Sequence, residues 1–354
     1  MGHRRVTAFL LLAVMVGGCA IGAAPTYTSQ DIASLPCEQD GRFFVPLEFD
    51  RDGTLLFASP IYDQRQVLED RLRNGKVRDV FVIVHGWNKP TQVAETDYQN
   101  FICRLYRRLT DDNKMTPGEF LIVGVFWRST FFSNQRDPAL LKPFTYFRIR
   151  RRADIVAQDS FPTLAATLTN PFPPGAVHPR IFLIGHSFGA RILVNGFVRN
   201  AEHESVRRLV AFKPDLLLLN AAISSEDLLP TARRSRLHPN RPKPGPVLRD
   251  SVNTPVYNIY SSKDVANGVA FRLASIFTSD EAACGAGSCA VDDFPILKVD
   301  SLGHFSETAL PPTKELFWNV DATEIIDAHN DIYKGRVALL LSELLMLARD
   351  QPPQ

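Results

Sequence analysis

Short apolar runs alternate along this chain with longer segments in which apolar residues recur every three or four positions. The runs are rich in branched and aromatic side chains, which is typical of strands buried on both faces. They cover residues 42–46, 54–58, 79–84, 120–127, 180–184, 215–220 and 255–260, and one more strand is expected within 295–302 or 316–322.

The segments with helical spacing cover residues 91–109, 147–168, 190–199 and 337–346. In the first of them, Tyr98, Phe101 and Leu105 fall on one face of the predicted helix. Apolar strands separated by such helices predict an α/β fold with a mostly parallel sheet covered by helices on both faces. We expect a single domain over residues 41–350, with a candidate cap or lid insertion at about 224–252, where a long loop separates two strands.

The N-terminus has the anatomy of a signal peptide over residues 1–18. A basic start is followed by an apolar run too short to span a bilayer, and then by Gly17 and Gly18. The ending Val16-Gly-Gly-Cys19 resembles the lipobox of bacterial lipoproteins, which implies cleavage before Cys19 and attachment of lipid to it. We therefore expect residues 19–40 to tether the protein to the bacterial cell envelope. The outer membrane is favoured because Ala20, and not aspartate, follows Cys19. An ordinary secretory signal is the alternative.

Composition and charge narrow the class of protein further. Of 354 residues, 45% are hydrophobic and 22% are charged, as in an ordinary globular chain. The chain holds 40 basic and 38 acidic residues, and removal of a signal that contains Arg4 and Arg5 leaves 38 of each. A formally neutral mature chain argues against nucleic acid as a partner. We also find no later stretch with the length and apolarity of a transmembrane helix.

Four cysteines remain once Cys19 is set aside. An even number in an exported protein suggests disulfides. Cys284 and Cys289 are the first candidate pair because a short glycine-rich loop joins them, and Cys37 with Cys103 follows by elimination. A buried free thiol is the alternative for Cys103. No histidine stands at zinc-ligand spacing from either pair, so we expect no metal.

The sequence Gly185-His-Ser-Phe-Gly189 has the pattern G-x-S-x-G and stands between a predicted strand and a predicted helix. A strand, a sharp turn and a helix place the serine of this motif on a strained elbow with its hydroxyl exposed. The two glycines allow the strand and the helix to approach closely. Ser187 is therefore the candidate nucleophile, and a glycine-flanked loop without a catalytic role is the alternative. His186 occupies the variable position of the motif and is not a candidate base.

From about residue 75 to residue 350 the chain resembles the α/β-hydrolase fold family, in its elbow and in the order of its polar residues. In that family the triad follows the order Ser, Asp or Glu, His. The resemblance implies Asp264 as the acid, with Glu226 and Asp227 as runners-up. It implies His329 as the base, because the base of this family lies between the last strand and the closing helix. His304 is the alternative catalytic base.

The oxyanion hole of that family uses two backbone N–H groups. The resemblance implies the amide of Phe188 and that of Trp87 in His85-Gly-Trp-Asn88, with Asn88 as the second choice. These residues predict a lipid-anchored serine hydrolase, esterase- or lipase-like, that cleaves a carboxylic ester through an acyl-enzyme without a cofactor. Two alternatives are an acyltransferase with the same triad and a non-enzymatic envelope lipoprotein that uses the fold as a binding platform.

Overall fold

A mostly parallel sheet runs through the part of the chain that the computed structural model describes. That part comprises residues 37, 43–50, 52–56, 63–86, 91–111, 115–130, 142–173, 175–223, 248, 254–264, 295–305 and 316–350, without the side chains of 91–95, 142–145 and 350. Within it the sheet has nine strands, in the order β2-β1-β4-β3-β5-β6-β7-β9-β8. Neighbouring strands are parallel except β1 and β2. The α/β class expected from the sequence is confirmed.

The strands coincide with the apolar runs, and both late candidates form strands. Their bounds are β1 Phe44–Phe49, β2 Leu55–Leu56, β3 Asp79–Val84, β4 Phe120–Trp127, β5 Arg180–His186, β6 Asp215–Leu219, β7 Val256–Tyr260, β8 Ile296–Lys298 and β9 Phe317–Asp321. The helices are α3 Gln64–Arg73, α4 Thr91–Thr110, α5 Lys142–Ile155, α6 Phe161–Thr169, α7 Phe188–Arg199, α8 Glu204–Ala211 and α13 Gly335–Asp350. Two short helical turns, the π-helical η2 Val156–Ser160 and the 3₁₀-helical η3 Asp331–Tyr333, complete the described elements.

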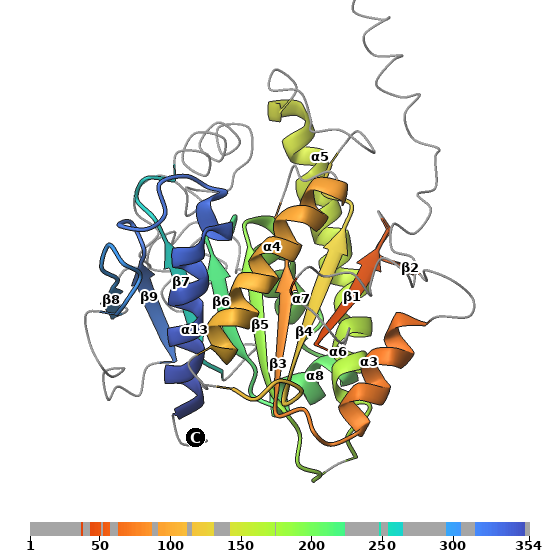
Figure 1. Ribbon diagram of the computed structural model, residues 1–354. Helices are drawn as coiled ribbons and strands as arrows, with labels where there is room; N and C mark the ends of the chain where they lie inside the picture. Colours follow the sequence, from red (N-terminus) through yellow and green to blue (C-terminus); the bar gives the residue numbers. More distant parts are fainter. Residues whose placement is uncertain are drawn as a thin grey trace, which may run out of the picture.

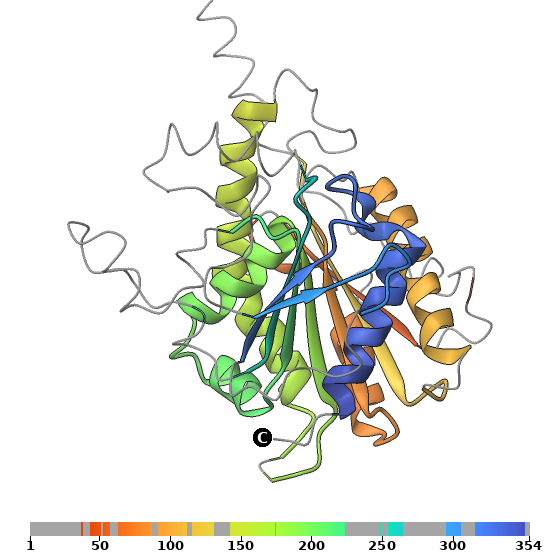
Figure 2. The same ribbon diagram turned by 90° about the vertical axis from the view of Figure 1, so that its left-hand side faces the viewer.

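Helices cover both faces of the sheet. Figure 1 shows α4 and α13 in front of the sheet and α7 behind it, and the view turned by 90° places the sheet between two helical layers (Figure 2). Alternate residues of each central strand point to opposite layers. In β3, Val80 and Val82 pack in the cluster with α5 to α8, whereas Phe81 and Ile83 pack in the cluster with α4 and α13. Burial on both faces explains why this strand reads as an unbroken apolar run.

The helix expected over 147–168 is interrupted. It consists of α5, the π-helical turn η2 and α6, and Pro162 occupies the first turn of α6. Proline has no N–H to donate to the preceding turn, so a continuous α-helical hydrogen-bond ladder cannot pass through this position. The turn also carries a tertiary contact, because the Ser160 hydroxyl donates to the carbonyl oxygen of Gly53 at 2.7 Å. The proline and the contact between Ser160 and Gly53 account for the π-helical turn that stands between α5 and α6.

One expected disulfide is present. Cys37 and Cys103 are bonded, with their Cα atoms 5.5 Å apart, and the bond ties residue 37 to α4. The alternative of a buried free thiol at Cys103 is therefore wrong. Several other expectations fall outside the described residues: the signal and most of the tether with Cys19, the candidate insertion at 224–252 apart from Leu248, and the residues Trp87, Asn88, Glu226, Asp227, Cys284 and Cys289.

The loops that matter for chemistry all follow the carboxyl ends of parallel strands. Gly86 follows β3, Ser187 follows β5, Asp264 follows β7, and His329 lies beyond β9. Parallel strands end at the same edge of a sheet, so residues distant in sequence are brought to one side of the molecule. The candidate site is built at this edge.

Candidate active site

Ser187 occupies a strained turn between β5 and α7. Its backbone angles are φ 54° and ψ −118°, a region that residues with a Cβ rarely adopt. Hydrogen bonds hold it there: its N–H donates to Leu219 at 3.0 Å, and its carbonyl oxygen accepts from Ala222 at 3.1 Å. The last residue of β6 and the residues that follow it therefore hold the turn by main-chain hydrogen bonds. The residue as a whole is only 3% exposed, so the exposed hydroxyl expected from the motif is not observed.

The glycines of the motif are required by the approach of backbone to backbone. A Cβ on Gly185 would lie 2.5 Å from the Cα of Ala190, and one on Gly189 would lie 2.1 Å from the carbonyl oxygen of Val84. Neither contact can be relieved by a side-chain rotation, because the opposing atoms belong to the main chain. The alternation of glycine around Ser187 is thus explained by the close packing of α7 against β5 and β3.

The loop after β3 touches the elbow directly. A Cβ on Gly86 would lie 2.8 Å from the Cβ of Ser187, so only glycine fits beside the serine. His85 fixes the start of this loop. Its Nε2 accepts from the Trp127 N–H at 3.2 Å, which leaves Nδ1 to donate to the Gly86 carbonyl oxygen at 2.8 Å. The indole N–H of Trp127 donates to the His85 carbonyl oxygen at 2.8 Å. The backbone next to Ser187 is therefore rigidly held.

Asp264 and His329 form a buried acid–base pair at the same edge. Nδ1 of His329 lies 2.7 Å from Oδ2 of Asp264, and the two side chains are 15% and 4% exposed. A carboxylate accepts hydrogen bonds only, so Nδ1 carries the hydrogen and Nε2 keeps its lone pair. The imidazole is thereby set in the tautomer that a general base requires.

Further contacts join the loop that carries Asp264 to the loop that carries His329. The Ser261 hydroxyl donates to the carbonyl oxygen of Ile326 at 2.5 Å, and the Ser262 N–H donates to the Thr323 hydroxyl at 2.9 Å. Beside the acid–base pair, Nζ of Lys263 lies 3.1 Å from Asp327. The pairing of Asp264 with His329 is therefore one of four contacts that align the loop after β7 with the loop after β9.

Asp331 shapes the turn that carries the histidine. Its Oδ2 accepts from the N–H groups of Asp327 at 3.2 Å and Ala328 at 3.1 Å, and it receives Nζ of Lys334 at 2.7 Å. Three donors on one carboxylate close the loop just before and after His329. The main chain beside His329 is thus held independently of the His329 side chain.

The alternative histidine lies elsewhere. His304 is half exposed and its Nδ1 is bonded to Glu343 of α13, while Asp300 accepts from its backbone N–H at 2.9 Å. The backbone N–H groups that donate to Asp300, that of His304 first, lower the pKa of its carboxyl. His304 is a loop residue paired with a helix carboxylate, and the structure pairs Asp264 with His329 instead.

A partly buried ion pair holds α7, the helix that follows Ser187. Arg191, 6% exposed, donates from Nε and Nη2 to the two oxygens of Asp154 on α5, at 2.8 and 3.1 Å. Asn195 donates to the same carboxylate at 2.7 Å. Two-pronged contact fixes orientation as well as distance. The helix α7 therefore cannot rotate about its axis without breaking this cluster.

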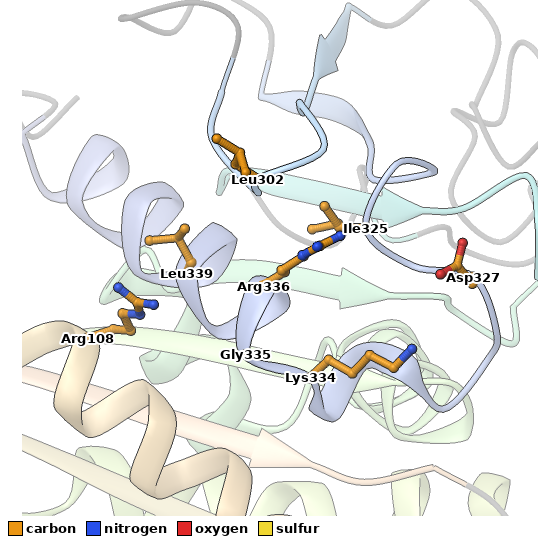
Figure 3. Close-up of a pocket in the computed structure, with 8 residues that line it drawn as sticks. All are labelled: Arg108, Leu302, Ile325, Asp327, Lys334, Gly335, Arg336 and Leu339. Carbon is orange, nitrogen blue, oxygen red and sulfur yellow. The ribbon is translucent and has the colours of Figure 1, made fainter.

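A surface hollow of about 570 Å³ adjoins the base segment from outside (Figure 3). Asp327 and Lys334 line it on either side of His329 in sequence, and Figure 3 shows Arg336 at its centre, directed toward Ile325. Arg108, at the end of α4, closes its other side. Neither Ser187 nor His329 lines this hollow, and we assign it no part in the chemistry of the serine.

Some of these residues escaped the sequence analysis. The pattern G-x-S-x-G marks Ser187, and chain order marks Asp264 and His329, but Asp154 and Asp331 carry no motif. Asp331 opens a short helical turn, but it accepts from N–H groups that precede it in the chain, so a helix-capping pattern does not predict these contacts. The partner of Asp154 lies 37 positions away on another helix, and no local pattern predicts such a pair.

Within the described residues, no group of three or more His, Cys, Asp and Glu side chains is placed to hold a metal ion. Among the described helices, none is both long and apolar enough to cross a membrane. No protein-family model matches the chain, and no curated protein sequence matches it significantly.

Proposed function

We propose that the protein is a serine hydrolase of the α/β-hydrolase type that cleaves a carboxylic ester. The observation that carries this proposal is the buried pair of His329 and Asp264, held 2.7 Å apart at the sheet edge where Ser187 occupies a strained elbow. The chain order Ser, Asp, His is the order of that family. The glycine packing around the elbow supports the proposal independently.

The chemistry follows from the tautomer of the base. Nε2 of His329 takes the proton of the Ser187 hydroxyl as its oxygen attacks the ester carbonyl, and the imidazolium so formed is stabilised by the carboxylate of Asp264. Collapse of the tetrahedral intermediate expels the alcohol, which receives that proton from His329, and leaves an acyl group on Ser187. Water, deprotonated by the same imidazole, then releases the acid.

Backbone amides stabilise the oxyanion in this proposal. The amide of Phe188 belongs to the first residue of α7, so the positive end of the helix dipole adds to its effect. Trp87 supplies the second donor in the proposal; it lies outside the described residues, but Gly86 directly before it is packed against Ser187. The contacts of Trp127 with His85 hold the main chain that leads to this residue.

A panel of p-nitrophenyl esters of graded acyl length tests the proposal, with and without detergent. The purified wild-type protein should release p-nitrophenol, and Ser187→Ala should lose this activity while its thermal unfolding stays unchanged. Product analysis with an added alcohol separates acyl transfer from hydrolysis, since both use the same acyl-enzyme. Failure of the wild-type protein to turn over any ester, or normal turnover by Ser187→Ala, would contradict the proposal.

We propose in addition that the enzyme acts from the cell envelope, held by lipid on Cys19. The support is the signal-like N-terminus ending in Gly-Gly-Cys. Cys19→Ser should then block lipid attachment and yield either unprocessed precursor or protein released from the membrane. Unchanged mature, membrane-bound protein in that variant would contradict the lipid anchor without affecting the proposed chemistry.

A further inference from the structure

His186 directly precedes the candidate nucleophile in the chain and contacts the candidate base in space. It is the last residue of β5, directly before Ser187, and it is 3% exposed. Its ring stands against that of His329, with centroids 4.7 Å apart. Its Nε2 lies 3.0 Å from the backbone carbonyl oxygen of His329. One side chain therefore connects the covalent neighbour of the serine to the main chain of the base.

The partners of His186 define its tautomer. A carbonyl oxygen can only accept, so Nε2 carries the hydrogen and donates it to His329. Nδ1 is then an acceptor, and the hydroxyl of Tyr333 lies 3.5 Å from it. Burial raises the pKa of that hydroxyl, which keeps its proton at neutral pH. The Nε2 of His186 thus has a fixed direction of donation, toward the main chain of His329.

Tyr333 is itself held by two residues of α4. Nη1 of Arg104 donates to its backbone carbonyl oxygen at 3.0 Å, and the ring of Phe101 meets its ring edge-on, with centroids 5.9 Å apart. Both partners lie on α4, which packs against this face of the sheet. Through Tyr333, the His186 ring is therefore linked to a helix that belongs to neither loop.

We propose that His186 is a positioning residue that sets the distance between Ser187 and His329. This inference rests on the proposed function. Asp264 controls the imidazole of His329 through its Nδ1, but it cannot fix the main chain from which that imidazole extends. Asp331 holds that main chain within its own loop, and the hydrogen bond from His186 ties it to the residue directly before Ser187. A displacement of about 1 Å in such a geometry costs on the order of 100-fold in rate.

Two polar substitutions separate this role from simple packing. In His186→Gln the side-chain amide reaches the position of Nε2 and can still donate to His329. In His186→Asn the amide ends at the position of Nδ1, too short to reach that carbonyl oxygen. We expect His186→Asn to lower kcat about 10- to 100-fold with little change in KM, and His186→Gln to stay within about fivefold of wild type.

The measurements are kcat and KM on a p-nitrophenyl ester, each normalised to folded protein by circular dichroism. His178→Asn is the matched control, because the His178 ring stacks on Phe212, with centroids 3.9 Å apart, away from the site; its kcat should be unchanged. Should His186→Asn fail to fold, Tyr333→Phe replaces it, and we expect a loss of about three- to tenfold in kcat. Equal kcat values in His186→Asn and His186→Gln, or an unchanged kcat in Tyr333→Phe where it stands in, would overturn the positioning role.

The proposed function and this inference fail in different ways. If the wild-type protein hydrolyses no ester and its Ser187 does not react with a fluorophosphonate, the proposed function fails and the positioning role falls with it. If the wild-type protein is active and the Asn and Gln variants do not differ, the positioning role alone is wrong.

Discussion

Replacing Asp264 by asparagine should nearly abolish catalysis while leaving the fold intact. The carboxylate is 4% exposed and lies 2.7 Å from Nδ1 of His329. It stabilises the imidazolium that forms as Ser187 attacks, and at an effective dielectric constant of about 20 a charge pair roughly 4 Å apart is worth about 4 kcal/mol. That energy corresponds to about 10³ in rate. An asparagine amide can also donate to Nδ1 and turn the imidazole into the wrong tautomer, so we expect a loss in kcat of about 10³ to 10⁴.

The assay is kcat on a p-nitrophenyl ester, with thermal unfolding measured in parallel. Asp327→Asn is the matched control, because it removes a carboxylate from the neighbouring loop, the one that carries His329. Its partner is Lys263, and both side chains are exposed, 47% for the lysine and 66% for the aspartate. Solvent screens an exposed pair and leaves it little energetic weight, so kcat should stay within about threefold of wild type. A folded Asp264→Asn protein with a kcat within tenfold of wild type would refute the role given to the carboxylate.

Three further predictions concern the base, the elbow and the opposite edge of the sheet. His329→Ala should lower kcat by about 10³-fold or more, whereas His304→Ala, whose ring is bonded to Glu343, should change it less than about threefold; the reverse ranking contradicts the assignment. Gly189→Ala gains about 1 kcal/mol of helix propensity but forces its Cβ to 2.1 Å from a carbonyl oxygen, so Tm should fall by several degrees, while Gly335→Ala, with no atom within 4 Å of its Cβ, should not lower it. Burial, partly offset by Arg180, raises the pKa of Asp215 from 3.8 to about 7. Between these two pH values the folded state binds a proton that the unfolded state has released. The stability of the protein should therefore fall as pH rises from about 4 to about 7. Asp215→Asn should therefore be more stable than wild type at pH 8, by up to about 4 kcal/mol, with the gain vanishing near pH 4; a gain that is equal at both pH values contradicts this origin.

The sheet was predictable because its central strands are buried on both faces and therefore read as apolar runs. The two helices that the sequence analysis missed are mostly polar or short. In α3 the buried apolar residues are only Leu68 and Leu72, and in α8 they are Val206 and Leu209. Two apolar residues give too little periodicity to reveal a helix. The interruption of the long helix depends on where Pro162 falls relative to a tertiary contact from Ser160, which local pattern does not show.

For the candidate site as well, local sequence reveals some residues and leaves other contacts hidden. Ser187 is recognisable because its strain needs glycines and a strand–helix junction close by in sequence. The choice of His329 over His304 followed from the order of elements, and the contact with Asp264 agrees with that choice. The contacts that align the two loops, and the bond from His186 to His329, join positions 61 to 143 residues apart. Such contacts are decided by packing, so one sequence does not reveal them.

The residue that reacts with a fluorophosphonate tests the proposed role of Ser187 most directly. The folded protein would be labelled, digested and analysed by mass spectrometry to locate the adduct. Only a serine activated by a base reacts at an appreciable rate. We predict one adduct, on Ser187, with labelling slowed strongly in His329→Ala and in Asp264→Asn. An adduct on a different residue, or no adduct on the folded wild-type protein, would contradict the assignment of Ser187 as an activated nucleophile.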